Sequence, residues 1–295
     1  MADDGLTRRD ILAAGAATAM GLALGRHAAG ARLFSAENPT STVVLIRRED
    51  AVTGGHQVNA KVVAEMIDEA VAVFAGVEDP AEAWARYVKP DDVAGVKISR
   101  CQWMRVYVEQ ATIDAVRARV SACGVADDRL HVKDMGFPAK ACTAVINVPS
   151  IKVHRSVGIA ASIKNYINLF TKKCSQFHKG LGSRLGENWL HPDIKGKTRL
   201  IVVDALRPYF GPGPQINPVY RWAYGGILVG TDPVAIDTIA IELMRRKRDA
   251  FKGEPWPLNP PPKVIPAAET EYHLGTCDPA KIKLVRLGAK DGMLI

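Results

Sequence analysis

The sequence lacks the short motifs that identify the common enzyme and nucleic-acid-binding classes. It has no G-x-S-x-G elbow, no P-loop, no HExxH, and no G-x-G-x-x-G after a predicted strand. It also lacks zinc-finger spacing, an aromatic RNP-like stretch and a basic arm, and its positive residues are mixed with acids except at Arg245–Arg248. These absences argue against a zincin-type site and against nucleic acid as a partner.

Cysteine is scarce, and its spacing matches neither a redox motif nor a ferredoxin. The five cysteines stand at positions 101, 123, 142, 174 and 277, and none forms a C-x-x-C pair. An odd number excludes complete pairing within the chain. Buried thiols are the ordinary interpretation. The alternative is a metal or iron–sulfur site built from Cys101, Cys142, Cys174, His154 and His178.

The apolar run near the N-terminus, residues 11–24, is shorter than the roughly 20 residues that span a bilayer. It follows Thr7–Leu12 (TRRDIL), which resembles the twin-arginine consensus, and it precedes a cleavage-type sequence at Ala29–Ala31. We therefore expect residues 1–31 to be a signal peptide for the twin-arginine translocase and residues 32–41 to be a linker. The expected location is periplasmic, with membrane anchoring where the signal stays uncut. Because this route moves folded proteins, it favours a cofactor or partner acquired before export.

The remaining chain, residues 42–295, has the composition of a single globular domain. Hydrophobic residues make up 47% of the sequence, which is enough for a sizeable core. The formal net charge is +8, so an anionic ligand or partner is favoured over a cationic one.

Strand-like and helix-like patterns alternate along this domain. β-Branched or apolar runs predict strands at 42–47, 93–99, 129–134, 143–148, 198–206, 226–230 and 281–287. Helical spacing and capping residues predict helices at 59–74, 80–87, 108–123 and 233–246. We therefore expect an α/β fold whose mixed, mostly parallel sheet carries helices on both faces. Functional side chains would then gather at the carboxyl ends of the strands.

Polar residues in otherwise apolar surroundings mark residues 146–171 as the candidate site. We expect a strand to Val148, a short connection that carries Lys152 and His154, and then an apolar helix that contains Lys164 and Asn165. A buried lysine costs several kcal/mol unless an opposite charge pairs with it. Lysine is suited to phosphate or carboxylate, although a lysine whose stem reaches the surface is the ordinary alternative.

Three further residues complete the predicted site. Lys97 ends a predicted strand and would supply positive charge, while Asp204 ends another strand and could contact a metal or a hydroxyl group. Asp232 is both a predicted ligand contact and a good helix cap. We predict ligand binding by Lys97, Lys152, His154, Lys164, Asn165 and Asp232, with His154 and Asp204 as the catalytic pair in a chemically active protein.

An ordered set of motifs resembles the bacterial and archaeal family called domain of unknown function 362. The resemblance rests on Val96–Ser99, Asn147–His154 (NVPSIKVH), Lys164-Asn165, Asp204, Gly211–Pro214, Gly226–Asp237 and Glu271–Asp278. Ser99 departs from the asparagine common in the family. We find no ferredoxin-like cysteine module here, although some relatives carry one. The resemblance implies that the site lies at the predicted strand ends. It does not imply a known reaction.

The sequence leaves three hypotheses about function. The first is an exported protein that binds a small anionic ligand or cofactor at the Lys/His/Asn site. The second is a metal or iron–sulfur protein that uses the Cys/His set. The third is a non-catalytic periplasmic partner of a redox complex, whose basic surface meets an acidic subunit.

Overall fold

The structure is a computed structural model, and it describes residues 34, 39–54, 56–100, 106–170, 173–213 and 216–295. The predicted signal peptide, residues 1–31, and the predicted metal ligand Cys101 lie outside these residues. No helix in the part of the chain described is long and apolar enough to cross a membrane.

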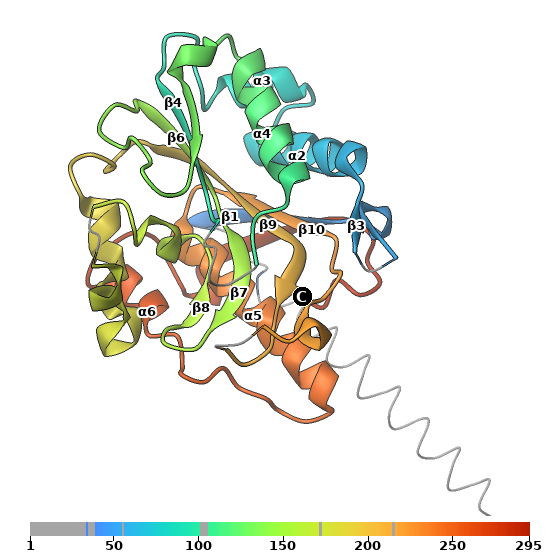
Figure 1. The fold of residues 1–295 in the computed structure, drawn as a ribbon. Helices are drawn as coiled ribbons and strands as arrows, with labels where there is room; N and C mark the ends of the chain where they lie inside the picture. The colour runs from blue at the N-terminus through green and yellow to red at the C-terminus, as the bar shows by residue number, and fades with distance from the viewer. Residues whose placement is uncertain (1–33, 35–38, 55, 101–105, 171–172, 214–215) are drawn as a thin grey trace, which may run out of the picture.

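A mixed sheet, mostly parallel, forms the centre of the molecule (Figure 1). Its main path runs β11-β1-β10-β9-β6-β4-β5, with β10 antiparallel to both β1 and β9 and the other neighbours parallel. The strands are β1 (Ser41–Arg47), β4 (Ala94–Ile98), β5 (Leu130–Lys133), β6 (Ala144–Val148), β9 (Thr198–Tyr209), β10 (Gly226–Gly230) and β11 (Ile282–Gly288). A separate small ribbon joins β2 (Val52–Thr53) to β3 (Gln57–Val58). The predicted sheet is confirmed.

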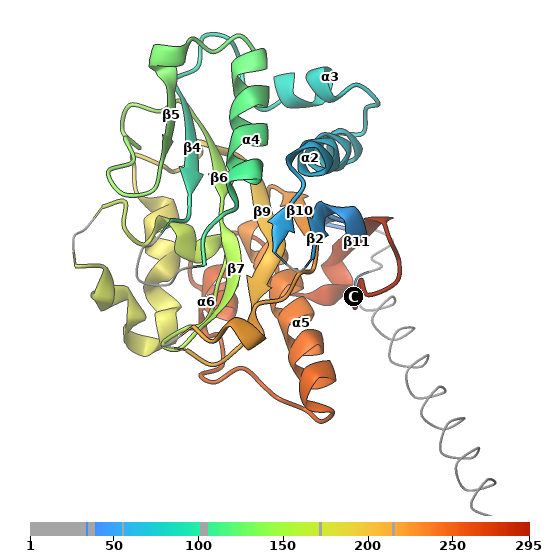
Figure 2. The same cartoon turned by 45° about the vertical axis from the view of Figure 1, so that its right-hand side comes forward.

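Helices cover both faces of this sheet, as the alternating pattern predicted. One face carries α2 (Ala60–Ala75), α3 (Pro80–Ala85) and α4 (Gln110–Ala122), of which α2 and α4 lie side by side (Figure 2). The other face carries α5 (Pro233–Lys252), α6 (Val264–Thr270) and the 3-10 segment η5 (Cys174–Leu190). Alternation along β1 explains the two cores, because Val44 and Ile46 join the first and Val43 and Leu45 join the second. The shorter 3-10 turns are η1 (Glu49–Ala51), η3 (Asp127–Arg129), η6 (Pro218–Tyr220) and η7 (Pro279–Lys281).

Capping residues set the helix boundaries close to the predicted positions. The Asn59 side chain accepts a hydrogen bond from the Val62 amide at the start of α2, and Gly76 ends that helix in the left-handed region. Asp232 caps α5, with Pro233 at its first position. This helix continues past the predicted residue 246 to Lys252, where Gly253 ends it with φ 78°.

The prediction for residues 150–170 was wrong in secondary structure. These residues form β7 (Ser150–His154), β8 (Gly158–Ala160) and the short 3-10 turn η4 (Ile163–Tyr166). Lys152 and His154 therefore lie in a strand, and Lys164 and Asn165 lie in a single turn. The sequence SIKVH has the period-two alternation of a strand, whereas its apolar content alone does not separate a strand from a helix.

The β7–β8 hairpin is fixed both to the sheet and to a distant loop. β7 runs parallel to β9, where Ser150 pairs with Asp204 and Lys152 pairs with Tyr209 across an irregularity in the register. Gly158 has φ 81°, and a Cβ atom there would lie 2.7 Å from the Pro260 carbonyl oxygen. The hairpin therefore needs glycine at position 158, where β8 begins. Figure 1 shows the hairpin beside one end of β9.

Candidate functional site

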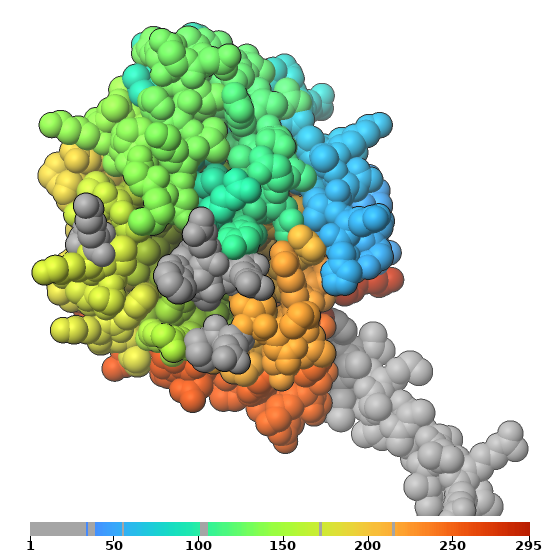
Figure 3. Space-filling view, in the orientation of Figure 1, coloured from blue at the N-terminus to red at the C-terminus, as the bar shows by residue number. Residues whose placement is uncertain are grey.

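A cavity of about 610 Å³ lies between the β7–β8 hairpin, η4, η5 and the loops that follow β4 and β5. The η5 segment, coloured yellow, and the green hairpin region share the face seen in Figure 3. The charged and imidazole side chains of the lining are Lys152, His154, Arg155, Lys164, His178 and Asp134. Of the predicted site residues, the structure brings Lys152, His154, Lys164 and Asn165 together in this lining.

Lys152 lies on the cavity side of β7 and is 4% exposed. Its ammonium group donates hydrogen bonds to Ser99 Oγ at 3.0 Å and to Ser150 Oγ at 2.9 Å, and it lies 3.4 Å from the Val106 carbonyl oxygen. These hydrogen bonds orient the ammonium group toward the cavity wall. The alternation of β7 explains the placement, because the neighbouring Ile151 and Val153 enter the core instead.

Lys97 is fully buried one layer behind the cavity, where it neutralises Asp134. Its Nζ donates to Asp134 Oδ1 at 2.8 Å and to the Ile98 carbonyl oxygen at 3.0 Å. Asp134 also accepts from the Arg100 amide at 2.7 Å and from Asn168 at 2.9 Å. Burial acts to raise the pKa of Asp134, but the Lys97 ammonium and these donors hold that pKa below its usual value. The acid in the lining is therefore already paired.

Asn165 positions the turn that carries Lys164. Its Nδ2 donates to the Lys97 carbonyl oxygen at 2.9 Å and to Asn147 Oδ1 at 2.7 Å, which fastens η4 to the ends of β4 and β6. Asn147 in turn donates to the Ser162 carbonyl oxygen at 3.2 Å. The side-chain amide of Asn165, a predicted ligand contact, thus donates its hydrogen bonds to other groups of the protein.

Asp237 holds the same turn from α5, a role that spacing alone did not indicate. Its carboxylate accepts from the Ser162 amide at 2.7 Å and from the Ile163 amide at 3.0 Å. Burial raises the pKa of Asp237 to about 6, while these donors and the Ser162 hydroxyl act to lower it. The family-like motif Gly226–Asp237 includes this residue, so the resemblance was the available signal.

Two neutral histidines face each other in the cavity lining. The ring centroids of His154 and His178 are 5.0 Å apart, and His154 Nδ1 accepts from the Ser156 amide at 3.2 Å. Burial, followed by the charge of Lys164, lowers the pKa of His154 to about 2 and that of His178 to about 4. Both imidazoles are therefore uncharged at neutral pH. His178 was only a supplementary candidate in the sequence, since nothing in its neighbourhood marks it.

Asp204 lies outside the set of described residues that line this cavity. Its carboxylate accepts from the Glu109 amide at 2.7 Å, from the Thr112 hydroxyl at 3.0 Å and from the Leu206 amide at 2.9 Å. Burial raises the pKa of Asp204 to about 6 against these donors. The carboxylate ties the start of α4 to β9, and the structure does not join it to His154.

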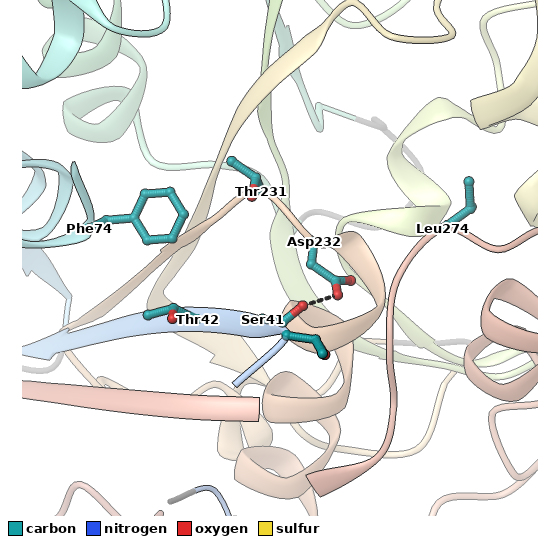
Figure 4. Close-up of a pocket in the computed structure, with 7 residues that line it drawn as sticks. Ser41, Thr42, Phe74, Thr231, Asp232 and Leu274 are labelled. Carbon is teal, nitrogen blue, oxygen red and sulfur yellow. Dashed lines mark hydrogen bonds between the residues drawn. The ribbon is translucent and has the colours of Figure 1, made fainter. Parts of the chain in front are cut away.

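Asp232 belongs to a second cavity of about 540 Å³, which Ser41, Thr42, Phe74, Thr231 and Leu274 also line (Figure 4). Its carboxylate accepts from the amides of Val234 at 2.8 Å, Ala235 at 2.9 Å and Thr276 at 3.0 Å. The Ser41 hydroxyl points at the same carboxylate and completes the set (Figure 4). Asp232 is thus a helix cap that joins three segments. It lies apart from the first cavity, which we call the lysine cavity because Lys152 and Lys164 line it.

No group of three His, Cys, Asp or Glu side chains suited to a metal ion occurs among the residues that the structure describes. Of the predicted Cys/His set, Cys174, His154 and His178 line the lysine cavity. Cys142 lies in the core, where burial raises the pKa of its thiol to about 11.

Residues 98–242 match the family model described as "Domain of unknown function (DUF362)". The chain belongs to the DUF362 family. The matched segment runs from the end of β4 into α5 and contains Lys152, His154, Lys164, Asn165 and Asp237. The DUF362 segment therefore supplies most of the cavity lining. No curated protein and no solved structure gives a significant match.

Proposed function

We propose that this DUF362 protein binds a small molecule that carries a phosphate or carboxylate group in the lysine cavity. The observation that carries the proposal is the charge of the lining. Lys152, Lys164 and Arg155 bring three positive charges, whereas the acid Asp134 is already bonded to Lys97. An anion compensates such a cluster at little cost, because it replaces water around charges that the fold already holds in place.

The lining also indicates the kind of molecule that fits. The volume of about 610 Å³ lies in the range of ordinary small-molecule sites. Ala160, Ala161 and Ile167 add an apolar wall beside the charged groups. The favoured ligand is therefore an anionic head with a compact apolar or neutral part. A single anion about 4 Å from one ammonium group gains about 4 kcal/mol at an effective dielectric constant of about 20.

Within this proposal, His154 is the candidate acid or base, since its imidazole is neutral and borders the cavity. Asn165 and Asp237 are positioning residues for Lys164. Asp204 supports β9 and α4 instead of acting as the partner of His154.

The predicted twin-arginine export and periplasmic location belong to the same proposal. That route carries folded proteins, so the ligand would be loaded before translocation. Native mass spectrometry of protein purified from the periplasm should show a retained anionic species, and protein made with Lys164→Met should lack it. A retained mass that is the same in both proteins would contradict this assignment.

Titration calorimetry with sulfate, phosphate and citrate tests the binding directly. We expect Lys164→Met to weaken the affinity for the tightest of these anions at least about tenfold, which corresponds to about 1.4 kcal/mol. The matched control is Lys195→Met, since Lys195 is an exposed lysine. Added neutral salt should weaken binding to the wild-type protein. Equal affinity in both variants, or binding of none of the three anions, would refute the proposal.

A further inference from the structure

The feature that goes beyond simple anion binding is the pair of imidazoles in the cavity wall. His154 comes from β7 and His178 from η5, and their ring centroids are 5.0 Å apart. His154 Nδ1 accepts from the Ser156 amide, so its proton lies on Nε2. His178 Nε2 is buried and has no hydrogen-bond partner among the described residues. A buried nitrogen of this kind carries a cost that a hydrogen bond to a ligand would remove.

We infer that an anion enters the lysine cavity together with a proton, which the His154–His178 pair takes up, and that His178 thereby becomes a ligand contact. This inference rests on the proposed function and adds a regulation to the same site. It makes binding depend on pH, and it assigns a role in anion binding to η5, which contributed no residue to the predicted anion site.

The surroundings of His154 and His178 explain why neither imidazole is protonated before an anion binds. Lys152 faces it from β7, Arg155 from the turn after β7, and Lys164 from η4. Cys174 lines the cavity from η5, and Asp134 lines it from the loop after β5, where Lys97 already neutralises it. Before an anion binds, burial and then these positive charges keep both imidazoles neutral.

A bound dianion reverses this balance. It attracts a proton onto one imidazole, and the resulting imidazolium donates a hydrogen bond to the anion. The second imidazole stays neutral, because two adjacent imidazolium ions would repel each other. The coupling between anion binding and proton uptake fixes the direction in which affinity changes with pH. Because the bound state holds one more proton than the empty state, affinity falls as pH rises, by up to about tenfold per pH unit.

Sulfate is a suitable probe, because it stays a dianion between about pH 5 and about pH 8, where histidine normally titrates. Calorimetry in buffers of different ionisation enthalpy counts the protons taken up per sulfate bound. We expect about one proton for the wild-type protein, with weaker binding at higher pH. His178→Gln should bind sulfate with almost no proton uptake and a flat pH profile. His131→Gln is the matched control, since His131 lies on β5 away from the cavity lining, and it should behave as the wild type does.

The outcomes separate this inference from the proposed function. Sulfate binding without proton uptake by the wild-type protein overturns the inference and leaves the anion site standing. Proton uptake that persists in His178→Gln overturns the role of the pair. A wild-type protein that binds no sulfate overturns the inference, and one that also binds neither phosphate nor citrate overturns the proposed function as well.

Discussion

The two cavities of this protein differ in how their charged side chains are partnered. In the cavity of Figure 4, the Asp232 carboxylate meets four donors that the chain itself supplies. In the lysine cavity, positive side chains outnumber the acid of the described lining, and that acid is already paired. The first arrangement is complete without a ligand and stabilises the fold. The second carries an excess of positive side chains, which is the basis of the proposed anion site.

The largest expected effect comes from breaking the ion pair behind the lysine cavity. Lys97→Met leaves the partly buried Asp134 beside the cavity without its ammonium partner, so the free energy of unfolding should fall by about 3 kcal/mol. Denaturant unfolding measures the loss. The double variant Lys97→Met/Asp134→Asn removes the stranded charge and should recover part of it. A double variant no more stable than the single one would show that the pair is not the source of the effect.

A smaller effect is expected in the second cavity. Asp232→Ala removes the cap of α5 and the bonds to Ser41 and Thr276, which should lower the free energy of unfolding by about 2 kcal/mol. Sulfate affinity should stay at the wild-type value, since Asp232 lies apart from the lysine cavity. A tenfold loss of sulfate affinity in this variant would mean that the two cavities are coupled.

The smallest effect depends on pH. The pKa of His154 is about 2 in the folded protein and near 6.5 when unfolded, so the unfolded state binds more protons as pH falls through the upper value. His154 therefore reduces stability on acidification. His154→Gln keeps an acceptor for the Ser156 amide and should gain about 1 kcal/mol on the wild type between about pH 7 and about pH 5.5. Thermal melts of both proteins measure this difference, and a constant difference would contradict the neutral, buried state of His154.

Most of the sheet and its flanking helices could be predicted, because the strands are continuous apolar runs and the helices begin at capping residues. Asn59 and Asp232 both cap helices as their positions indicated. The secondary-structure prediction for residues 150–170 was wrong because short apolar segments do not show a clear strand or helix periodicity. Ser150, Lys152 and His154 alternate correctly for a strand, but the alternation covers only five residues.

The sequence indicated the residues that converge at strand ends, and it did not indicate those that distant chain segments bring to the same region. The carboxyl ends of β4 and β6 bring Lys97 and Asn147 to Asn165. His178 and Asp237 reach the same place from η5 and α5, which only the packed fold reveals. Asp204 and Asp232 are also polar residues next to strand ends, yet backbone amides satisfy both of them. Sequence pattern does not show which donors will surround a carboxylate.

The long strand β9 connects the floor of the lysine cavity to the centre of the sheet. It pairs with β10, β6 and β7, so the strand that carries Lys152 is bonded directly to the middle of the sheet. Amides in β7 that face β9 should then exchange with deuterated solvent about as slowly as those of β10, because both open only when the domain unfolds as a whole. If the proposed anion binds over such a floor, Lys152 is already in position, and little conformational entropy is lost on binding.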